Sequence, residues 1–176
     1  MTTLNNWYNS NLASYEKDYI DTGAGFCSDR NLQSGSWSAT GSHNYAAYGR
    51  LYNKGSESAS LQCDSQDVYT TTDSSSGNKS LQYPIGLVTA DEAALTGITY
   101  NNANTGSYLY TGEYYWTMSP SNYGSWASVF IVNNDGYLDN NSVSNLWGVG
   151  VRPVINLKSA IAITGSGTTS DPFKIQ

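Results

Sequence analysis

Charged residues are scarce in this chain. Only 12% of its 176 residues are Asp, Glu, Lys or Arg, about half the proportion typical of soluble domains. Fourteen acidic residues outnumber eight basic ones, which gives a net charge of −6. A protein that holds a nucleic acid by its phosphates needs the opposite balance, so we do not expect nucleic acid as a partner.

Long hydrophobic runs and heptad repeats are also missing. No apolar run approaches the roughly 18 residues of a membrane-spanning helix, and the residues of a coiled coil do not recur at its spacing. We therefore expect no membrane contact by this chain itself. Aromatic residues, in contrast, reach 13%, with fifteen Tyr and five Trp, and Asn, Ser and Thr make up about a third of the chain. With 39% hydrophobic residues, the chain can bury a core, and its length predicts a single domain, residues 1–176.

Cysteine is limited to Cys27 and Cys63, which form no C-x-x-C pair and have no His nearby. A metal site is therefore not expected. In a polar, Tyr-rich chain we predict one disulfide, which closes a loop of about 35 residues and stabilises the fold by about 3–4 kcal/mol; two buried free thiols are the alternative. A disulfide implies an oxidising compartment, extracellular or at the cell surface. Because Met1–Leu4 carries no signal peptide, we expect a leader or anchor to be absent from this chain.

Two helices are predicted. Apolar side chains recur at helical spacing over residues 3–20, namely Leu4, Tyr8, Leu12, Tyr15 and Tyr19. Thr89 and Glu92 have the spacing of a capping box, which begins a second helix over residues 89–96, and Gly97 can follow its C-terminal end.

Strands are predicted mainly in the C-terminal half. Residues 114–118 and 126–132 are rich in β-branched and aromatic side chains, and the first of these strands is expected to stop at Ser119-Pro120. Asn133-Asn134-Asp135-Gly136 predicts a tight turn, with Tyr137-Leu138 pairing back across it. Further strands are expected at residues 45–52 and 68–72, in the final core strand 150–157, and in a hairpin of 161–163 with 173–175.

Catalytic constellations are weak. The single histidine, His43, lies in a polar loop, and no G-x-S-x-G motif accompanies it; we interpret it as a surface residue rather than the base of a triad. Asp91, Glu92 and Glu113 offer carboxylates for glycoside hydrolysis, but a helix start at Thr89 already explains the first two. We expect no catalytic residue and no cofactor.

Calcium is a further alternative. Asn133, Asp135 and Asp139 offer oxygen ligands around Gly136. A second, looser cluster consists of Asp64, Asp67 and Asp73. Neither has EF-hand spacing, and Asn-Asp-Gly is mainly hairpin chemistry. Calcium binding at the first cluster stays open, and our prediction includes no metal site.

Residues 121–147 combine rings with small polar residues. The rings are Tyr123, Trp126, Phe130, Tyr137 and Trp147, interleaved with Asn, Ser and Asp. This composition is typical of binding surfaces, because Tyr and Trp supply contact area at low entropy cost and Ser and Asn supply adaptable hydrogen bonds. The alternative is that the rings are core residues of short strands.

Several motifs carry a family resemblance. The C-terminal ones are Tyr115-Trp116-Thr117-Met118-Ser119-Pro120, Asp135-Gly136-Tyr137-Leu138 and Gly150-Val151-Arg152-Pro153-Val154-Ile155-Asn156-Leu157. They resemble a bacterial C-type lectin-like domain of the formylglycine-generating-enzyme subclass. Phe26-Cys27-Ser28-Asp29-Arg30 and the stretch 85–93 also resemble pilin-like surface proteins of Gram-positive gut bacteria.

The resemblance implies an α+β, C-type lectin-like fold, with two helices flanking a twisted, mostly antiparallel sheet and long irregular loops. The family includes retroelement-diversified variable proteins, whose binding surface precedes the final Gly-Arg strand; here that is the ligand-display segment 121–147. The candidate ligand contacts are Tyr123, Trp126, Ser128, Phe130, Asp139, Asn140, Asn141, Ser144, Asn145, Leu146 and Trp147. The implied scaffold residues are Trp116, Val132, Leu138, Arg152 and Val154. We expect Arg152 to be partly buried, with its donors bonded to backbone carbonyls.

Some family features are missing. The sequence lacks the Glu-Pro-Asn, Gln-Pro-Asp and Trp-Asn-Asp calcium motifs of the sugar-binding lectins, and the late cysteine pair of the enzymes. We therefore predict a non-enzymatic, receptor- or adhesin-like domain, of the kind that retroelements diversify, which binds a protein or glycan ligand on another cell or surface. A structural pilin-like subunit and an enzyme of the same fold are the alternatives, and a phage particle is the alternative location. No oligomeric state is predicted.

Overall fold

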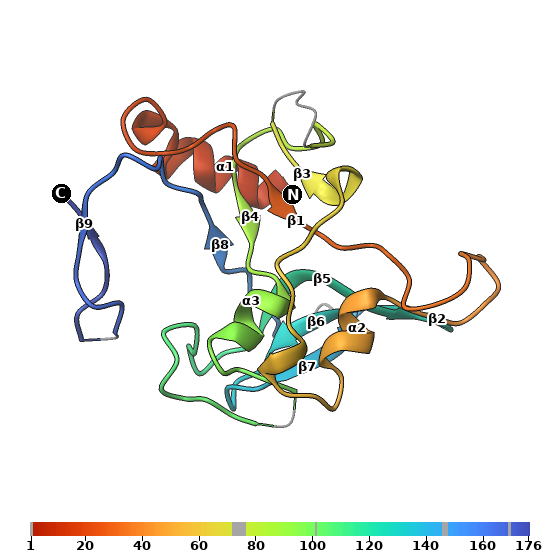
Figure 1. Cartoon of the computed structure of the whole chain (residues 1–176). Coiled ribbons are helices and arrows are strands. Elements are labelled where there is room, and N and C mark those ends of the chain that lie inside the picture. Colours follow the sequence, from red (N-terminus) through yellow and green to blue (C-terminus); the bar gives the residue numbers. More distant parts are fainter. Residues whose placement is uncertain (1, 72–76, 101, 146–147, 169) are drawn as a thin grey trace.

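The computed structural model describes residues 2–71, 77–100, 102–145, 148–168 and 170–176 (Figure 1). Within these ranges the helices are α1 (Thr2–Asn11), α2 (Ala46–Leu51) and α3 (Ala90–Leu95), with 3-10 turns η1 (Ala13–Tyr15), η2 (Ser56–Ser58) and η3 (Ser65–Asp67). The strands are β1 (Phe26–Cys27), β2 (His43–Asn44), β3 (Val68–Tyr69), β4 (Gly86–Leu87), β5 (Tyr115–Tyr123), β6 (Ala127–Val132), β7 (Leu138–Ser142), β8 (Pro153–Val154), β9 (Ile163–Thr164) and β10 (Lys174–Ile175). The named strands pair in antiparallel fashion. The protein is therefore α+β.

The largest sheet of the described residues has the strand order β2-β5-β6-β7. Its β6–β7 hairpin closes at Asn133–Gly136, where the Gly136 N–H donates to the Asn133 carbonyl over 3.0 Å and the Asn133 N–H donates to the Tyr137 carbonyl over 3.0 Å. Gly136 has φ +85°, a conformation that glycine adopts without steric cost. The predicted turn and its pairing strands are confirmed.

Helices α2 and α3 cover one face of this sheet (Figure 1). Side chains alternate along a strand, which places Phe130 and Val132 on the covered face, with Leu138 opposite Val132. The buried cluster contains Ala47, Leu51, Val88, Ala90, Ala93, Ala94, Ile98, Leu109, Tyr115, Phe130, Val132 and Leu138. The largest buried cluster of the described residues therefore occupies this face of the sheet.

A disulfide joins Cys27 to Cys63, with a Cα–Cα distance of 6.0 Å. The predicted bridge is confirmed, and the alternative of two free thiols is wrong. Beside it, β1 pairs with β3, so that Cys27 lies opposite Val68. The disulfide and this two-residue ladder both help to hold the irregular N-terminal half together.

A charged network connects this irregular half to the helices. Arg50 donates from Nε to Asp91 Oδ1 over 3.0 Å, and from Nη2 to Asp91 Oδ2 and Asp29 Oδ2 over 2.9 Å each. The two carboxylate side chains are only 9% (Asp29) and 5% (Asp91) exposed, and the Arg50 side chain is 24% exposed. The hydrogen bond that Arg50 donates to Asp91 is the largest cause that raises the pKa of Arg50 above its ordinary value. The network ties α2, α3 and the segment after β1 together.

The capping box at α3 is confirmed. The Thr89 hydroxyl accepts from the Glu92 N–H over 3.0 Å, and the Glu92 carboxylate accepts from the Thr89 N–H over 2.7 Å. Thr89→Ala is expected to lower the free energy of unfolding by about 1 kcal/mol, because it leaves a helical N–H without its acceptor. Urea denaturation monitored by circular dichroism measures this loss. Thr89→Ser keeps the hydroxyl and is the matched control; equal losses in the two variants would contradict the capping role.

The helix predicted over residues 3–20 is shorter than expected. α1 ends at Asn11, and the chain continues through η1 and turns. Only the first part of the apolar stripe has a surface to pack on, since Tyr8 is buried in a small cluster with Ile20 and Ile85 whereas Tyr15 is 49% exposed. Several Asn residues, which are poor helix formers, also weaken the segment.

Two strand predictions need correction. Residues 45–52, expected as a strand, form α2, whose buried residues Ala47 and Leu51 have the i, i+4 spacing of a helix face. The strand expected to stop at Ser119-Pro120 continues through Pro120 to the end of β5. The pairing of β5 with β6 shifts register on both sides of Pro120, and an irregular ladder of this kind accommodates a residue without an N–H.

The final core strand predicted over residues 150–157 is wrong in extent and in burial. Only Pro153–Val154 forms a strand, β8, which pairs with β4, while Gly150 bridges to Tyr115 and Leu157 bridges to Ile20. Val151 is 57% exposed. The segment thus passes from one partner to the next, because Pro153 cannot donate to a continuous ladder.

The scaffold role expected for Arg152 is confirmed in its contacts. Its Nη1 donates to the Leu109 carbonyl over 2.6 Å and its Nη2 donates to the Tyr108 carbonyl over 3.0 Å. The guanidinium carbon lies 5.7 Å from the centre of the Tyr115 ring. Arg152 therefore fastens the loop before β5 to the C-terminal segment.

The C-terminal hairpin is confirmed as β9 and β10. It extends away from the main sheet (Figure 1), and Ile163, Phe173 and Ile175 on it are 50%, 61% and 45% exposed. In the part of the chain that the structure describes, no helix is long and apolar enough to span a membrane.

Candidate ligand-binding site

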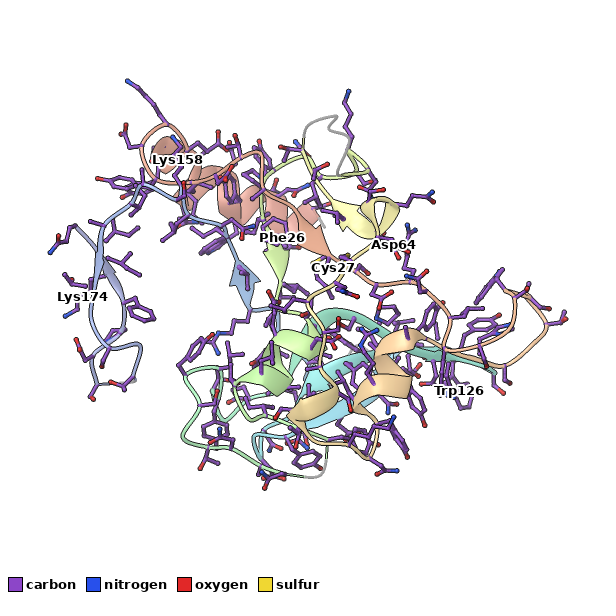
Figure 2. All side chains as sticks on the ribbon, in the orientation of Figure 1. Phe26, Cys27, Asp64, Trp126, Lys158 and Lys174 are labelled. Atoms are coloured by element: carbon purple, nitrogen blue, oxygen red, sulfur yellow. A yellow bond between two sulfur atoms is a disulfide. The ribbon has the colours of Figure 1, made fainter. Side chains whose placement is uncertain are left out.

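Four rings gather at one end of the main sheet, where β5 ends beside β2 and the start of β6. Tyr123 is the last residue of β5 and pairs with His43 of β2. The Trp37 ring lies 5.0 Å from the Tyr123 ring and 5.2 Å from the His43 ring, centre to centre. Trp126, in the turn between β5 and β6, is at the far end of the sheet (Figure 2). We refer to Trp37, His43, Tyr123 and Trp126 as the aromatic tip.

Two of these rings are open to solvent. Trp37 is 55% exposed and Trp126 is 65% exposed. Large apolar side chains are normally buried, and exposed aromatic rings are a common sign of a binding surface. The tip is therefore a candidate contact site.

The loop that carries Trp37, residues 33–42, is fastened to the sheet at several points. The Gln33 N–H donates to the Asn44 carbonyl over 2.8 Å at its base. Further out, the Tyr123 hydroxyl donates to the Ala39 carbonyl over 3.0 Å, and His43 Nε2 lies 2.9 Å from the Ser38 carbonyl oxygen. Trp37 is thus presented by a loop that is held before any ligand arrives, which lowers the entropy lost on binding.

Several of the predicted ligand contacts lie near the tip. Ser142 of β7 pairs with Ser128 of β6, and the Val143 N–H donates to the Ala127 carbonyl over 3.0 Å. This pairing places the end of β7 beside the Trp126 turn. The polar contacts there are connected, since the Ser142 and Ser144 hydroxyls are 2.7 Å apart and Asn145 Nδ2 donates to Asn141 Oδ1 over 3.2 Å. Tyr123, Trp126, Asn141, Ser144 and Asn145 therefore share one end of the sheet.

The other predicted contacts do not belong to this group. Phe130 is completely buried and Ser128 is 7% exposed, because both point toward the face that the helices cover. They are core residues, and their prediction as ligand contacts is wrong. Asp139 and Asn140 are half-buried and lie closer to the opposite end, where Asp139 pairs with Ile131. Leu146 and Trp147 lie outside the described residues.

Trp37 was not among the predicted contacts, although the sequence contains a signal for it. It is a single large ring within Gly35-Ser36-Trp37-Ser38, a polar stretch with no apolar neighbour to form a core with it. His43, which the sequence predicts to be a surface residue, lies at the base of the same loop. It is half-buried, and its ring contacts Trp37 and the Ser38 backbone, so it supports the loop.

The carboxylates considered for hydrolysis have structural partners. Asp91 binds Arg50 and accepts from the Ser60 N–H over 2.9 Å, and Glu92 closes the capping box. Glu113 is exposed in the loop before β5.

The calcium alternative gains no support from the turn at Asn133. Asn133 is buried, and its Oδ1 accepts from the Asp135 N–H over 2.7 Å, which is the hairpin role. Among the residues with described positions, no group of three His, Cys, Asp or Glu side chains is arranged to hold a metal ion. Asp73, of the second cluster, lies outside the described ranges.

No family model, curated protein or solved structure matches this chain. The structure alone therefore gives the class of the protein. It is an α+β domain, crosslinked by a disulfide, with exposed rings at one end of its main sheet.

Proposed function

We propose that this chain is a non-enzymatic ligand-binding domain of the cell surface or extracellular space, and that its aromatic tip captures a protein or glycan ligand. The observation that carries this proposal is the pair of exposed indoles at one end of the main sheet: Trp126 in the turn between β5 and β6, and Trp37 against the Tyr123 ring. Trp and Tyr dominate the binding energy of most interfaces, because they bury large areas while losing few rotamers. The disulfide agrees with an oxidising compartment.

We further propose a C-type lectin-like fold of the kind found in retroelement-diversified variable proteins. This rests on the motif resemblance, and the mixed α+β architecture with mostly antiparallel strands is compatible with it. In such a domain the scaffold stays constant while exposed positions change. The positions suited to change here are those at the end of the sheet, from Tyr123 and Trp126 to Asn141, Ser144 and Asn145.

An enzyme of the same fold that works through its cysteines needs both sulfurs free. Cys27 and Cys63 are instead bonded to each other, so the structure offers no support for that alternative.

Trp126→Ala is expected to weaken ligand binding by about 30-fold or more, which corresponds to a hot-spot loss of about 2 kcal/mol. The measurement is retention on arrays of immobilised glycans and of extracellular protein fragments, followed by titration of each hit. Trp7→Ala is the matched control, because Trp7 is also exposed, at 44%, but lies on α1, away from the tip (Figure 1). Hits that survive both Trp126→Ala and Tyr123→Ala would show that the tip is not the binding surface.

The same proteins test the pilin-like alternative. The exposed apolar side chains of the β9–β10 hairpin make self-association a second candidate function. Sedimentation over a range of concentrations measures it: a mass that rises with concentration, and that Phe173→Ser returns to the monomer value while Trp126→Ala does not, would identify the hairpin as the contact between subunits.

A further inference from the structure

A polar cleft of about 650 Å³ opens next to the aromatic tip. One wall is the segment Arg30–Leu32 and the other is Asp64–Asp67, with Tyr45 and Trp37 at the side. The volume is within the range of small-ligand sites, about 300–1,000 Å³. Trp37 belongs to both features, so a ligand that rests on the tip can continue into the cleft.

The two walls are held together by covalent and ionic bonds. Cys27 and Cys63, which form the disulfide, stand a few residues before one wall and directly before the other. Asp67 accepts from Arg30 twice, at Oδ1 from Nε over 2.7 Å and at Oδ2 from the backbone N–H over 2.9 Å. Across the mouth, Asn31 Nδ2 donates to Asp64 Oδ2 over 3.0 Å. The cleft is thus formed before a ligand enters.

The charges of the lining discriminate against anions. The cleft has one guanidinium, from Arg30, and two carboxylates, from Asp64 and Asp67. Asp67 already holds Arg30, and this hydrogen bond is the largest cause that raises the pKa of the guanidinium above its ordinary value. The charge of Asp64 is therefore not balanced by Arg30. It would repel a phosphate, sulfate or sialyl group, and the net charge of −6 of the whole protein adds to this repulsion.

The remaining groups match a neutral polyol. Asn31 and Asp64, both exposed, offer an amide and a carboxylate side by side, and such a pair can donate to and accept from neighbouring hydroxyls. The exposed Trp37 ring offers a flat apolar surface beside them. A sugar ring has the complementary shape, with hydroxyls on its rim and C–H groups on one face.

We propose that this cleft binds one neutral sugar residue of a glycan, held by hydrogen bonds to Asn31 and Asp64 while Trp37 covers its apolar face. The inference rests on the proposed ligand-binding function of the tip and names the ligand class: a neutral glycan rather than a protein.

The test uses the full chain on an array of immobilised oligosaccharides. The array contains neutral glycans ending in glucose, galactose, mannose or N-acetylhexosamine, the same cores with sialic acid or sulfate, and a set of peptides. We expect retention on neutral glycans, and at least tenfold weaker binding by Asn31→Ala and by Asp64→Ala. Asn6→Ala, which removes an exposed amide on α1, is expected to bind like the unmodified protein. Thermal melting of each variant verifies that the fold is intact.

The outcomes separate the two proposals. If only peptides or anionic glycans are retained, and Trp126→Ala abolishes that retention while the cleft variants do not, the sugar site is overturned and the proposed function of the tip stands. If neutral glycans are retained equally by the cleft variants and by Trp126→Ala, both proposals fall. If nothing on the array is retained, the sugar site is overturned, and the protein-fragment array alone decides the function of the tip.

Discussion

Arg50→Met is expected to lower the free energy of unfolding by about 3 kcal/mol, a large part of the about 5–15 kcal/mol that stabilises a typical domain. The substitution keeps the apolar stem and removes the guanidinium that binds Asp29 and Asp91. Both carboxylates are more than nine-tenths buried, so the variant leaves two like charges without their cation. Because the Arg50 side chain is about a quarter exposed, water replaces part of the lost interaction, which keeps the effect at the lower end of the range for buried pairs.

Chemical denaturation in urea measures this loss, and a triple variant is its matched control. Asp29→Asn/Arg50→Met/Asp91→Asn removes the stranded charges together with the cation, so it is expected to recover a substantial part of the stability. A single variant within about 0.5 kcal/mol of the unmodified protein would show that the network contributes little to folding. A triple variant less stable than Arg50→Met would show that the carboxylates act mainly through their other partners, such as the Ser60 N–H.

Cys27→Ala/Cys63→Ala is expected to cost about 3–4 kcal/mol, because the disulfide closes a loop across a sequence separation of 36 residues and removing it returns that loop's freedom to the unfolded chain. The local ladder is too short to compensate, since β1 and β3 pair through only two residues each. The loss is measured as a lower urea midpoint. The urea dependence of the free energy is also expected to steepen, since an uncrosslinked chain exposes more surface on unfolding.

Reduction of the unmodified protein with a phosphine tests the contribution of the disulfide independently of the substitutions. It should shift the midpoint to that of the double variant, and the same reductant should leave the double variant unchanged. Two thiols that react with a thiol reagent in the native, unreduced protein would contradict the crosslink directly.

The features that the sequence predicted well are those set by neighbouring residues. Thr89 and Glu92 specify the start of α3 at a spacing of three residues, and Asn133–Gly136 specifies the turn of the β6–β7 hairpin, so local chemistry suffices for both. The disulfide was predictable for a different reason, since two cysteines allow only one pairing.

The features that the sequence predicted poorly depend on distant contacts. Residues 45–52 are rich in Tyr and read as a strand, but Ala47 and Leu51 form a helix because α3 and β5 lie beneath them. Phe130 and Trp126 are both rings in a β-prone stretch, and only the position of the helices makes one core and the other surface. Trp37 lies in a loop that is remote from Tyr123 in sequence. Its contact with the Tyr123 ring depends on the tertiary fold, so no local sequence pattern predicts it.

The position of the disulfide makes the shape of the cleft depend on the redox state of Cys27 and Cys63. The two cysteines come shortly before the two walls in sequence, so the disulfide limits how far apart Asn31 and Asp64 can move. Thermodynamic reciprocity then applies: whatever free energy the crosslink adds to the binding of a sugar, the bound sugar adds to the crosslink's resistance to reduction. If the cleft binds a sugar as proposed, an occupied domain is expected to be harder to reduce than an empty one, and reduction of the disulfide is expected to weaken the binding by the same free energy.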